Sequence, residues 1–278
     1  MSARRALRFR RGDRETGAPL LLELLAWGYL LWWLLPIVVA VRASFSTTDA
    51  ALPEGFTTAW YWDVLHHPLT RSIFLRTFRL AALTVLIATP LGVSLAVGID
   101  RLRGRVPTAL TATVLVGVAT PQIAIAGALF ILFGFVAPWV GLDVRAQLLA
   151  HVTLAVPFVA LIVLLRLRQL GRSYEEIAMD LGASPMESIH RVALPLSAPA
   201  LVAAAVVAFT LSFDNLVLSN AVCLRIESCG TVPMLMYESV LRGPPEPDIY
   251  ALATMALVVT LTGLAVVLGA IRLMRVRR

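Results

Sequence analysis

An acidic residue stands within an apolar stretch of the chain. Asp214 occurs in the run FTLSFDNLVLSN, where its polar neighbours are Ser212, Asn215, Ser219 and Asn220. A carboxylate inside a bilayer costs about 3 kcal/mol or more unless it faces water or a partner. In a helix, Ser212, Asn215 and Ser219 share one face, because residues three or four positions apart lie on the same side. The pattern indicates a solvent-lined translocation path, with interhelical hydrogen bonding as the alternative.

Two further polar positions lie in apolar runs. In ATPQIAIAG, Pro121 removes a backbone hydrogen bond and is expected to kink a helix, and Gln122 can line a cavity or satisfy the freed groups. His151 lies in a third run. Plain packing is the favoured interpretation of His151, and a pore-lining or interhelical role is the alternative.

The two cysteines, Cys223 and Cys229, are six residues apart, and both a disulfide and a pair of free thiols remain open. The four histidines and two cysteines show no metal-ligand spacing, so we expect no metal site. The sequence also contains no HExxH or GxSxG motif, and we predict a non-catalytic protein that holds no cofactor of its own.

The composition is that of a polytopic membrane protein. Hydrophobic residues make up 59% of the chain and charged residues only 15%, against roughly 25% charged in soluble proteins. A membrane-spanning helix needs about 20 apolar residues. Six segments qualify, and we predict an all-α fold with six transmembrane helices near Leu20–Val41, Leu80–Ile99, Thr108–Val136, Ala146–Leu165, Leu196–Val222 and Ile249–Ile271.

The basic residues predict the orientation of the chain and exclude one activity. All 24 are arginine, and a phosphate-binding loop of the form GxxxxGK[ST] needs a lysine, so any ATP must be bound by another subunit. With six spans, 17 arginines lie on the side of the termini and seven on the other side. Positive charge favours the cytoplasm, so both termini and the loop 166–197 are predicted to be cytoplasmic. Scattered over several loops, these arginines do not indicate nucleic-acid binding.

The predicted organisation is a basic N-terminal segment, residues 1–19, followed by a transmembrane domain, residues 20–278. Within that domain the loop 166–197 is unusually polar. Ser173 and Glu176 have the spacing of a capping box, which predicts a short helix to Asp180 that Gly182 ends. A second short helix is predicted to start at Ser184-Pro185. The loop is therefore expected to form a helical hairpin at the inner membrane face, with an exposed surface that needs a partner.

The loop resembles the EAA motif of binding-protein-dependent ABC importer permeases. That motif is EAA, three residues, Gly, nine residues and IxLP. This chain has EIA at 176–178, then Gly182, then VALP at 192–195, with the spacing kept throughout. The segments RSIFLRTFRLAALTVLIATPLG, LGASPMESIHRVALPLSAPAL, LSFDNLVLS and VPMLMYESVLRG extend the likeness over most of the chain, to the second permease of spermidine/putrescine-type importers.

This resemblance implies the fold of a type I importer permease, placed in the plasma (inner) membrane of a prokaryote. It implies four kinds of partner: a sister permease, two ATP-binding cassette subunits that hold ATP and Mg, an extracytoplasmic substrate-binding protein and membrane lipid. In such a permease, Glu176 contacts the ATPase, Ala178 allows close approach and Gly182 permits a sharp turn. The residues that the motif assigns to ATPase coupling are Glu176, Ala178, Asp180, Gly182, Ala183, Leu194 and Pro195.

The chain departs from that group at two positions of the expected path. Gln122 and Asn215 stand where acids are expected, so the path of Ser212, Asp214, Asn215, Ser219 and Gln122 carries fewer carboxylates than a polycation favours. The substrate therefore stays open between a polyamine, another small amine or opine-like compound, and a phosphonate. The predicted function is inward transport by alternating access, coupled to separate ATPases. The alternative is a self-contained secondary transporter or channel.

Overall fold

The computed structural model describes residues 20–47, 55–243 and 246–276, and the predicted segment 1–19 lies outside them. Every regular element in these three ranges is a helix. The elements are α1 (Leu20–Ala43), α2 (Ala59–His66), α3 (Pro68–Arg101), α4 (Val106–Ala119), α5 (Gln122–Ile131), the π-helical η1 (Leu132–Val136), α6 (Val144–Leu170), α7 (Ser173–Asp180), α8 (Pro185–Ser188), the π-helical η2 (Ile189–Ala193), α9 (Leu194–Leu196), α10 (Ala198–Phe213), α11 (Leu216–Val222), α12 (Ile226–Cys229), α13 (Val232–Arg242) and α14 (Pro247–Val276).

The prediction of an all-α membrane protein is confirmed. Helices α1, α3, α6 and α14 are each long and apolar enough to cross a bilayer. Two bent pairs bring the number to six if each pair is counted as one span. In one pair, α4 and the α5–η1 segment meet at 99°, and in the other, residues 185–196 and α10 meet at 72°.

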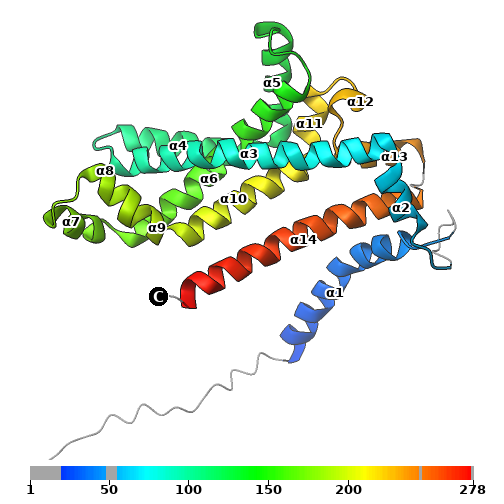
Figure 1. Cartoon of the computed structure of the whole chain (residues 1–278), viewed down its shortest axis with the longest axis horizontal. Helices are drawn as coiled ribbons and strands as arrows, with labels where there is room; N and C mark the ends of the chain where they lie inside the picture. The colour runs from blue at the N-terminus through cyan, green and yellow to red at the C-terminus, as the bar shows by residue number, and fades with distance from the viewer. Residues whose placement is uncertain (1–19, 48–54, 244–245, 277–278) are drawn as a thin grey trace, which may run out of the picture.

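The helices that correspond to predicted spans three and five are interrupted more sharply than the sequence suggested. The predicted kink at Pro121 is a full break, because α4 ends at Ala119 and α5 turns away from the bundle (Figure 1). The prediction of one helix over Leu196–Val222 is wrong. Helix α10 ends at Phe213 and α11 begins at Leu216, because the side chain of Asn215 accepts the backbone N–H of Leu218 and starts a new helix.

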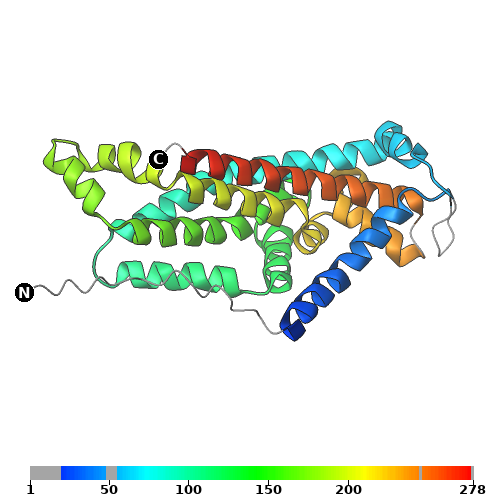
Figure 2. The ribbon, with the colours of Figure 1, turned by 90° about the horizontal axis from the view of Figure 1, so that it is seen from below.

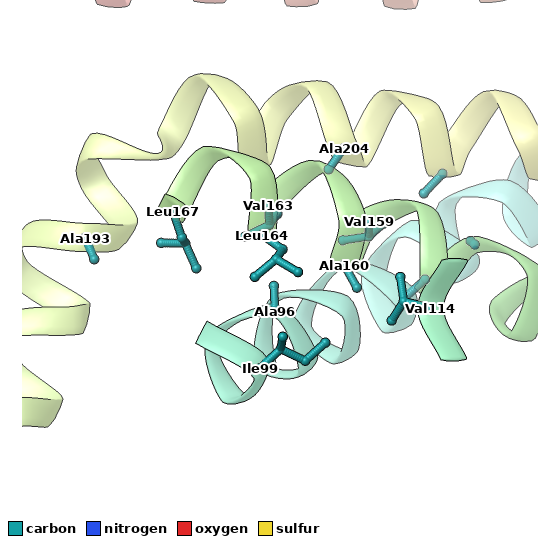
Figure 3. Close-up of a cluster of buried hydrophobic side chains, with 13 residues drawn as sticks. Ala96, Ile99, Val114, Val159, Ala160, Val163, Leu164, Leu167, Ala193 and Ala204 are labelled. Carbon is teal, nitrogen blue, oxygen red and sulfur yellow. The ribbon is translucent and has the colours of Figure 1, made fainter. Parts of the chain in front are cut away.

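Helices α3, α6 and α10 run alongside one another and form the main core (Figures 1 and 3). Small residues allow close packing there, since Ala96, Ala160 and Ala204 are fully buried and larger side chains such as Val163 and Leu167 fill the space between them (Figure 3). Close approach through small residues is the usual means of helix association in a membrane.

Gly92 marks the closest approach of α3 to α6. A Cβ atom built at this position lies 2.5 Å from Cγ1 and 2.6 Å from Cβ of Val159. No side chain fits there without moving one of the two helices. The packing of α3 on α6 therefore depends on the absence of a side chain at residue 92.

The segments that carry the candidate functional residues lie at different positions along the length of the bundle. Helices α7 and α8 lie at one end of α3, α6 and α10, and the short helices α12 and α13 lie towards the opposite end (Figures 1 and 2). The breaks before α5 and α11 lie between these two ends (Figure 1). The core helices thus connect a helical hairpin at one end with interrupted helices farther along.

Candidate functional site: a helical hairpin and two helix breaks

Helices α7, α8, η2 and α9 (residues 173–196) form a helical hairpin, here called the α7–α9 hairpin. Gly182 makes its turn with φ of +94°, a conformation that glycine adopts without strain. The N–H of Gly182 donates to the carbonyl of Met179 at 2.9 Å, and that of Ala183 donates to the carbonyl of Ala178 at 3.0 Å. The end of the first helix at Asp180 and the start of the second at Pro185 are as predicted.

The capping of the two hairpin helices differs from the prediction. The proposed box of Ser173 and Glu176 does not form, because Ser173 is already helical and the N-cap, Arg172, makes no side-chain capping bond. Instead, Ser184 and Glu187 form a complete capping box at the start of α8. Hydrogen bonds from Ser184, together with the charge of Arg191, hold the pKa of the Glu187 carboxyl below its usual value.

The outer surface of the hairpin mixes acidic and apolar side chains. Glu176 and Asp180 are exposed, as are Ile177, Leu181 and Met186. Leu181 is 85% exposed at the tip of the turn. Other predicted coupling residues support this surface or flank it, since Ala178, Ala183 and Leu194 are half-buried and Pro195 is exposed. The hairpin therefore presents a compact knob on which the apolar side chains of Ile177, Leu181 and Met186 are exposed.

Glu175 behaves differently from its neighbour Glu176. It is only 5% exposed and forms an ion pair with Arg101, the last residue of α3. Nearby, Arg172 donates to the backbone carbonyl of Asp100. Sequence reasoning missed this link, because no local spacing relates a residue of α3 to one of α7.

The second candidate region surrounds the break between α10 and α11. The imidazole of His151, on α6, lies between a serine on each side of the break. Its Nδ1 is 2.7 Å from Oγ of Ser212, on α10, and its Nε2 is 3.1 Å from Oγ of Ser219, on α11. His151 is 1% exposed, so the interhelical role that the sequence left as an alternative is the one that the structure shows.

The partners of Ser212 define the direction of these hydrogen bonds. Thr84 donates to the carbonyl of Leu80, and Ser212 donates to Oγ1 of Thr84 at 3.1 Å. Ser212 must then accept from Nδ1–H of His151, which leaves Nε2 to accept from Ser219. The network joins α3, α6, α10 and α11 and fits a neutral imidazole with its proton on Nδ1.

The break before α5 is tied to the break before α11. Nδ2 of Asn215 donates to Oε1 of Gln122 at 3.2 Å. The two residues stand at the starts of α11 and α5, and these helices pack side by side. Gln122 and Asn215 stand where the resemblance led us to expect acidic residues, and the structure pairs their two amides with each other.

Asp214 is the exposed member of the predicted path. It lines a cavity of about 260 Å³ between α10, α13 and α14, where Thr210 and Thr260 are the hydroxyl-bearing lining residues. The other lining residues are apolar: Phe213, Val232, Pro233, Met236, Ala253, Ala256 and Leu257. Ser212 and Ser219 do not share this surface, because they point into the bundle and bind His151. The two serines do face the same side, as predicted, but they are buried, so the structure shows for them the interhelical hydrogen bonding that the sequence left as the alternative.

A disulfide closes the segment that follows α11. Cys223 and Cys229 are bonded to each other, with Cα atoms 5.7 Å apart. Arg76, on α3, also holds this part of the chain, because its guanidinium donates to the carbonyls of Ile226, Glu227 and Gly230 at 3.0 to 3.3 Å. Both contacts restrain the segment between α11 and α13. The described residues contain no cluster of three His, Cys, Asp or Glu side chains that could hold a metal ion.

Comparison with known proteins relates this arrangement to one family. Residues 88–276 match the family described as binding-protein-dependent transport system inner membrane component. The putrescine transport system permease protein PotI of Escherichia coli K12 is 34% identical over 228 residues, which cover 80% of each chain. The spermidine/putrescine transport system permease protein PotC of the same strain is 32% identical over 237 residues, covering 82% of this chain and 84% of PotC.

Solved structures share the fold at low sequence identity. A chain of a bacterial ABC transporter involved in the import of the acidic polysaccharide alginate superposes with a TM-score of 0.74 at 15% identity, covering 91% of this chain and 95% of that one. A chain of the MetNI methionine ABC transporter, in an inward-facing conformation, gives a TM-score of 0.62 at 19% identity, covering 74% of this chain and 95% of that one.

Proposed function

This chain belongs to the family of binding-protein-dependent transport system inner membrane components and has the fold of an ABC importer permease, and we propose that it moves a small cationic amine inward in an ATP-driven complex. The observation that carries the proposal is the α7–α9 hairpin. It places Glu176 and the turn at Gly182 on an exposed knob. Such a knob suits docking in a groove of an ATPase subunit.

The proposed cycle follows from the position of that knob. Two separate cassette subunits bind ATP and Mg and close on it. Closure moves the hairpins of this chain and of a sister permease, and the helix bundle rocks between outward-open and inward-open states. A substrate-binding protein delivers the solute from outside. In this orientation the hairpin and both termini are cytoplasmic, which agrees with the distribution of arginine.

Substitutions at the hairpin test the docking. Glu176→Lys should reverse the charge that is proposed to contact the ATPase and so weaken docking. Gly182→Asp should strain a turn that has φ of +94°. Both variants should lose co-purification of the ATPase and lose uptake while inserting normally. Glu246→Lys is the matched control, because it reverses an exposed glutamate at the other end of the bundle. Normal uptake and normal co-purification by both hairpin variants would remove the proposed docking role.

The cationic substrate is proposed from Asp214 and from the relatives. PotI and PotC are named as putrescine and spermidine/putrescine permeases, and among the described residues Asp214 is the charged one that lines the cavity between α10, α13 and α14. A carboxylate with apolar walls suits an ammonium group on an aliphatic chain.

Asp214→Asn tests this substrate class with little change of shape. Uptake of labelled putrescine by the complex should fall about tenfold, the loss expected when one partner of a charged hydrogen bond is made neutral. Asp63→Asn, at an exposed aspartate of α2, is the control for loss of a charge elsewhere. Equal putrescine uptake by Asp214→Asn and wild type would contradict a cation-binding role.

A further inference from the structure

We propose that Glu175 and Arg101 are positioning residues that carry the movement of the α7–α9 hairpin into α3 during transport. The inference rests on the proposed function, because it requires that an ATPase moves the hairpin. It adds a step that docking alone does not provide, since a docked hairpin must also pull on the helices that surround the path.

The two consecutive glutamates of α7 face opposite environments. Successive residues of an α-helix point about 100° apart, so an exposed Glu176 places Glu175 towards the protein. Glu175 is 5% exposed, whereas Glu176 is exposed and belongs to the segment that matches the EAA motif. One carboxylate is thus available to a partner, and the other is committed to the chain's own interior.

The buried carboxylate is paired with a cation on the core helix. The side chain of Glu175 is 7% exposed and that of Arg101 is 27% exposed, and they form a direct ion pair. Removal of one partner from a buried ion pair leaves the other charge uncompensated, and Arg101 also lies 3.9 Å from Oδ2 of Asp100. Arg172 adds a second bond, from its guanidinium to the carbonyl of Asp100.

The charges also suit the helix ends that carry them. Glu175 lies in the first turn of α7 and Arg101 lies in the last turn of α3. A carboxylate at a helix N-terminus and a cation at a C-terminus are both favoured by the helix dipoles. The pair therefore joins the start of the hairpin to the end of α3 in an arrangement that the backbone itself favours.

Helix α3 is suited to receive this movement. It is 34 residues long and packs along both α6 and α10. It also bears Thr84, which accepts from Ser212 next to the break in the fifth span. Because a packed helix moves as a unit, a displacement at Arg101 is transmitted along α3 towards that break.

Charge reversal tests the link in the assembled complex. The variants are Arg101→Glu, Glu175→Arg and the double reversal, each co-expressed with the cognate permease, ATPase and binding protein. Arg103→Glu is the matched control, because Arg103 is an exposed arginine two residues beyond the end of α3. Three quantities are measured: co-purification of the ATPase, ATP hydrolysis and uptake in proteoliposomes.

Each single reversal is expected to lower uptake about tenfold, which corresponds to the coupling energies typical of such networks. The ATPase should still co-purify and hydrolyse ATP, because Glu176 and the docking surface are intact. The double reversal should restore uptake to within about threefold of wild type, since the pair is re-formed with opposite signs.

Two results would overturn the inference. One is wild-type uptake by both single variants. The other is a double reversal that inserts and binds the ATPase but transports no better than the singles. Failure of the proposed function gives a different result, because the wild-type chain would then not co-purify with the ATPase. That result would also overturn this inference.

Discussion

Nδ2 of Asn215 donates a hydrogen bond to Oε1 of Gln122 at 3.2 Å. This bond joins the start of α11 to the start of α5, the two helices that follow the breaks. The same Asn215 accepts the N–H of Leu218 through Oδ1 at 2.8 Å. One side chain therefore both starts α11 and attaches it to α5. We expect α5 and α11 to move as one unit when the permease changes state.

Substitution of the amide pair tests that unit. Gln122→Leu removes the acceptor, and Asn215→Asp removes the donor while keeping the cap of α11. Each should reduce uptake several-fold, because α5 and α11 lose a hydrogen bond worth about 1 kcal/mol. The double variant should lose no more than the more severe single variant, since both remove one bond. Additive losses in uptake assays would show that the two side chains act separately.

His151 is predicted to stabilise the break between α10 and α11. His151→Leu leaves Ser212 and Ser219 without their buried partner, and should lower the free energy of unfolding by about 1–3 kcal/mol. His151→Gln keeps a donor and an acceptor and should lose less. Thermal unfolding in detergent measures the difference, with His190→Leu as an exposed control. A thermal midpoint of His151→Leu equal to that of His190→Leu would contradict the stabilising role of these hydrogen bonds.

Two glycines of α3 are predicted to respond in opposite directions. Gly92→Ala places a Cβ 2.5 Å from Cγ1 of Val159 and should destabilise the protein by about 1–3 kcal/mol. Gly98→Ala meets nothing within 4 Å and should be neutral or stabilise α3 by about 0.5–1 kcal/mol. The same thermal assay compares them. Equal shifts in both variants would mean that α3 and α6 are not as close at Gly92 as described.

The hairpin capping predicts a dependence on pH. The pKa of Glu187 is lowered by its bonds to Ser184, so the box stabilises α8 above the usual glutamate pKa and weakens as pH falls through the lowered one. Ser184→Ala should speed amide hydrogen exchange in residues 186–189 at neutral pH, and wild type should approach the variant in acid. Ser173→Ala should leave exchange unchanged, because Ser173 caps nothing. Faster exchange in Ser173→Ala alone would restore the sequence-based assignment.

Local patterns predicted much of the fold. Apolar runs of bilayer length indicated the membrane helices, and Gly182 and Pro185 indicated where the hairpin turns, because these signals act within a few residues. The break at Asn215 was missed although its signal was present, since asparagine is a favoured N-cap. The long apolar run around it outweighed that signal.

The interactions that organise the candidate site could not be derived from spacing. The ion pair of Glu175 with Arg101 and the contacts of His151 with its two serines join residues far apart in the chain. Burial of Glu175 beside an exposed Glu176 is likewise set by packing against α3. Sequence patterns assign residues to faces of a helix, but which charges meet depends on how the helices are placed.

Reconstitution with components left out tests ATP-driven import by this chain most directly. Proteoliposomes containing this chain, its sister permease, the ATPase subunits and the binding protein should accumulate labelled amine only when ATP is supplied on the hairpin side. Omission of the ATPase or of the binding protein should abolish accumulation. Uptake by this chain alone, driven by an ion gradient and indifferent to ATP, would contradict ATP-driven import and support the secondary-transporter alternative.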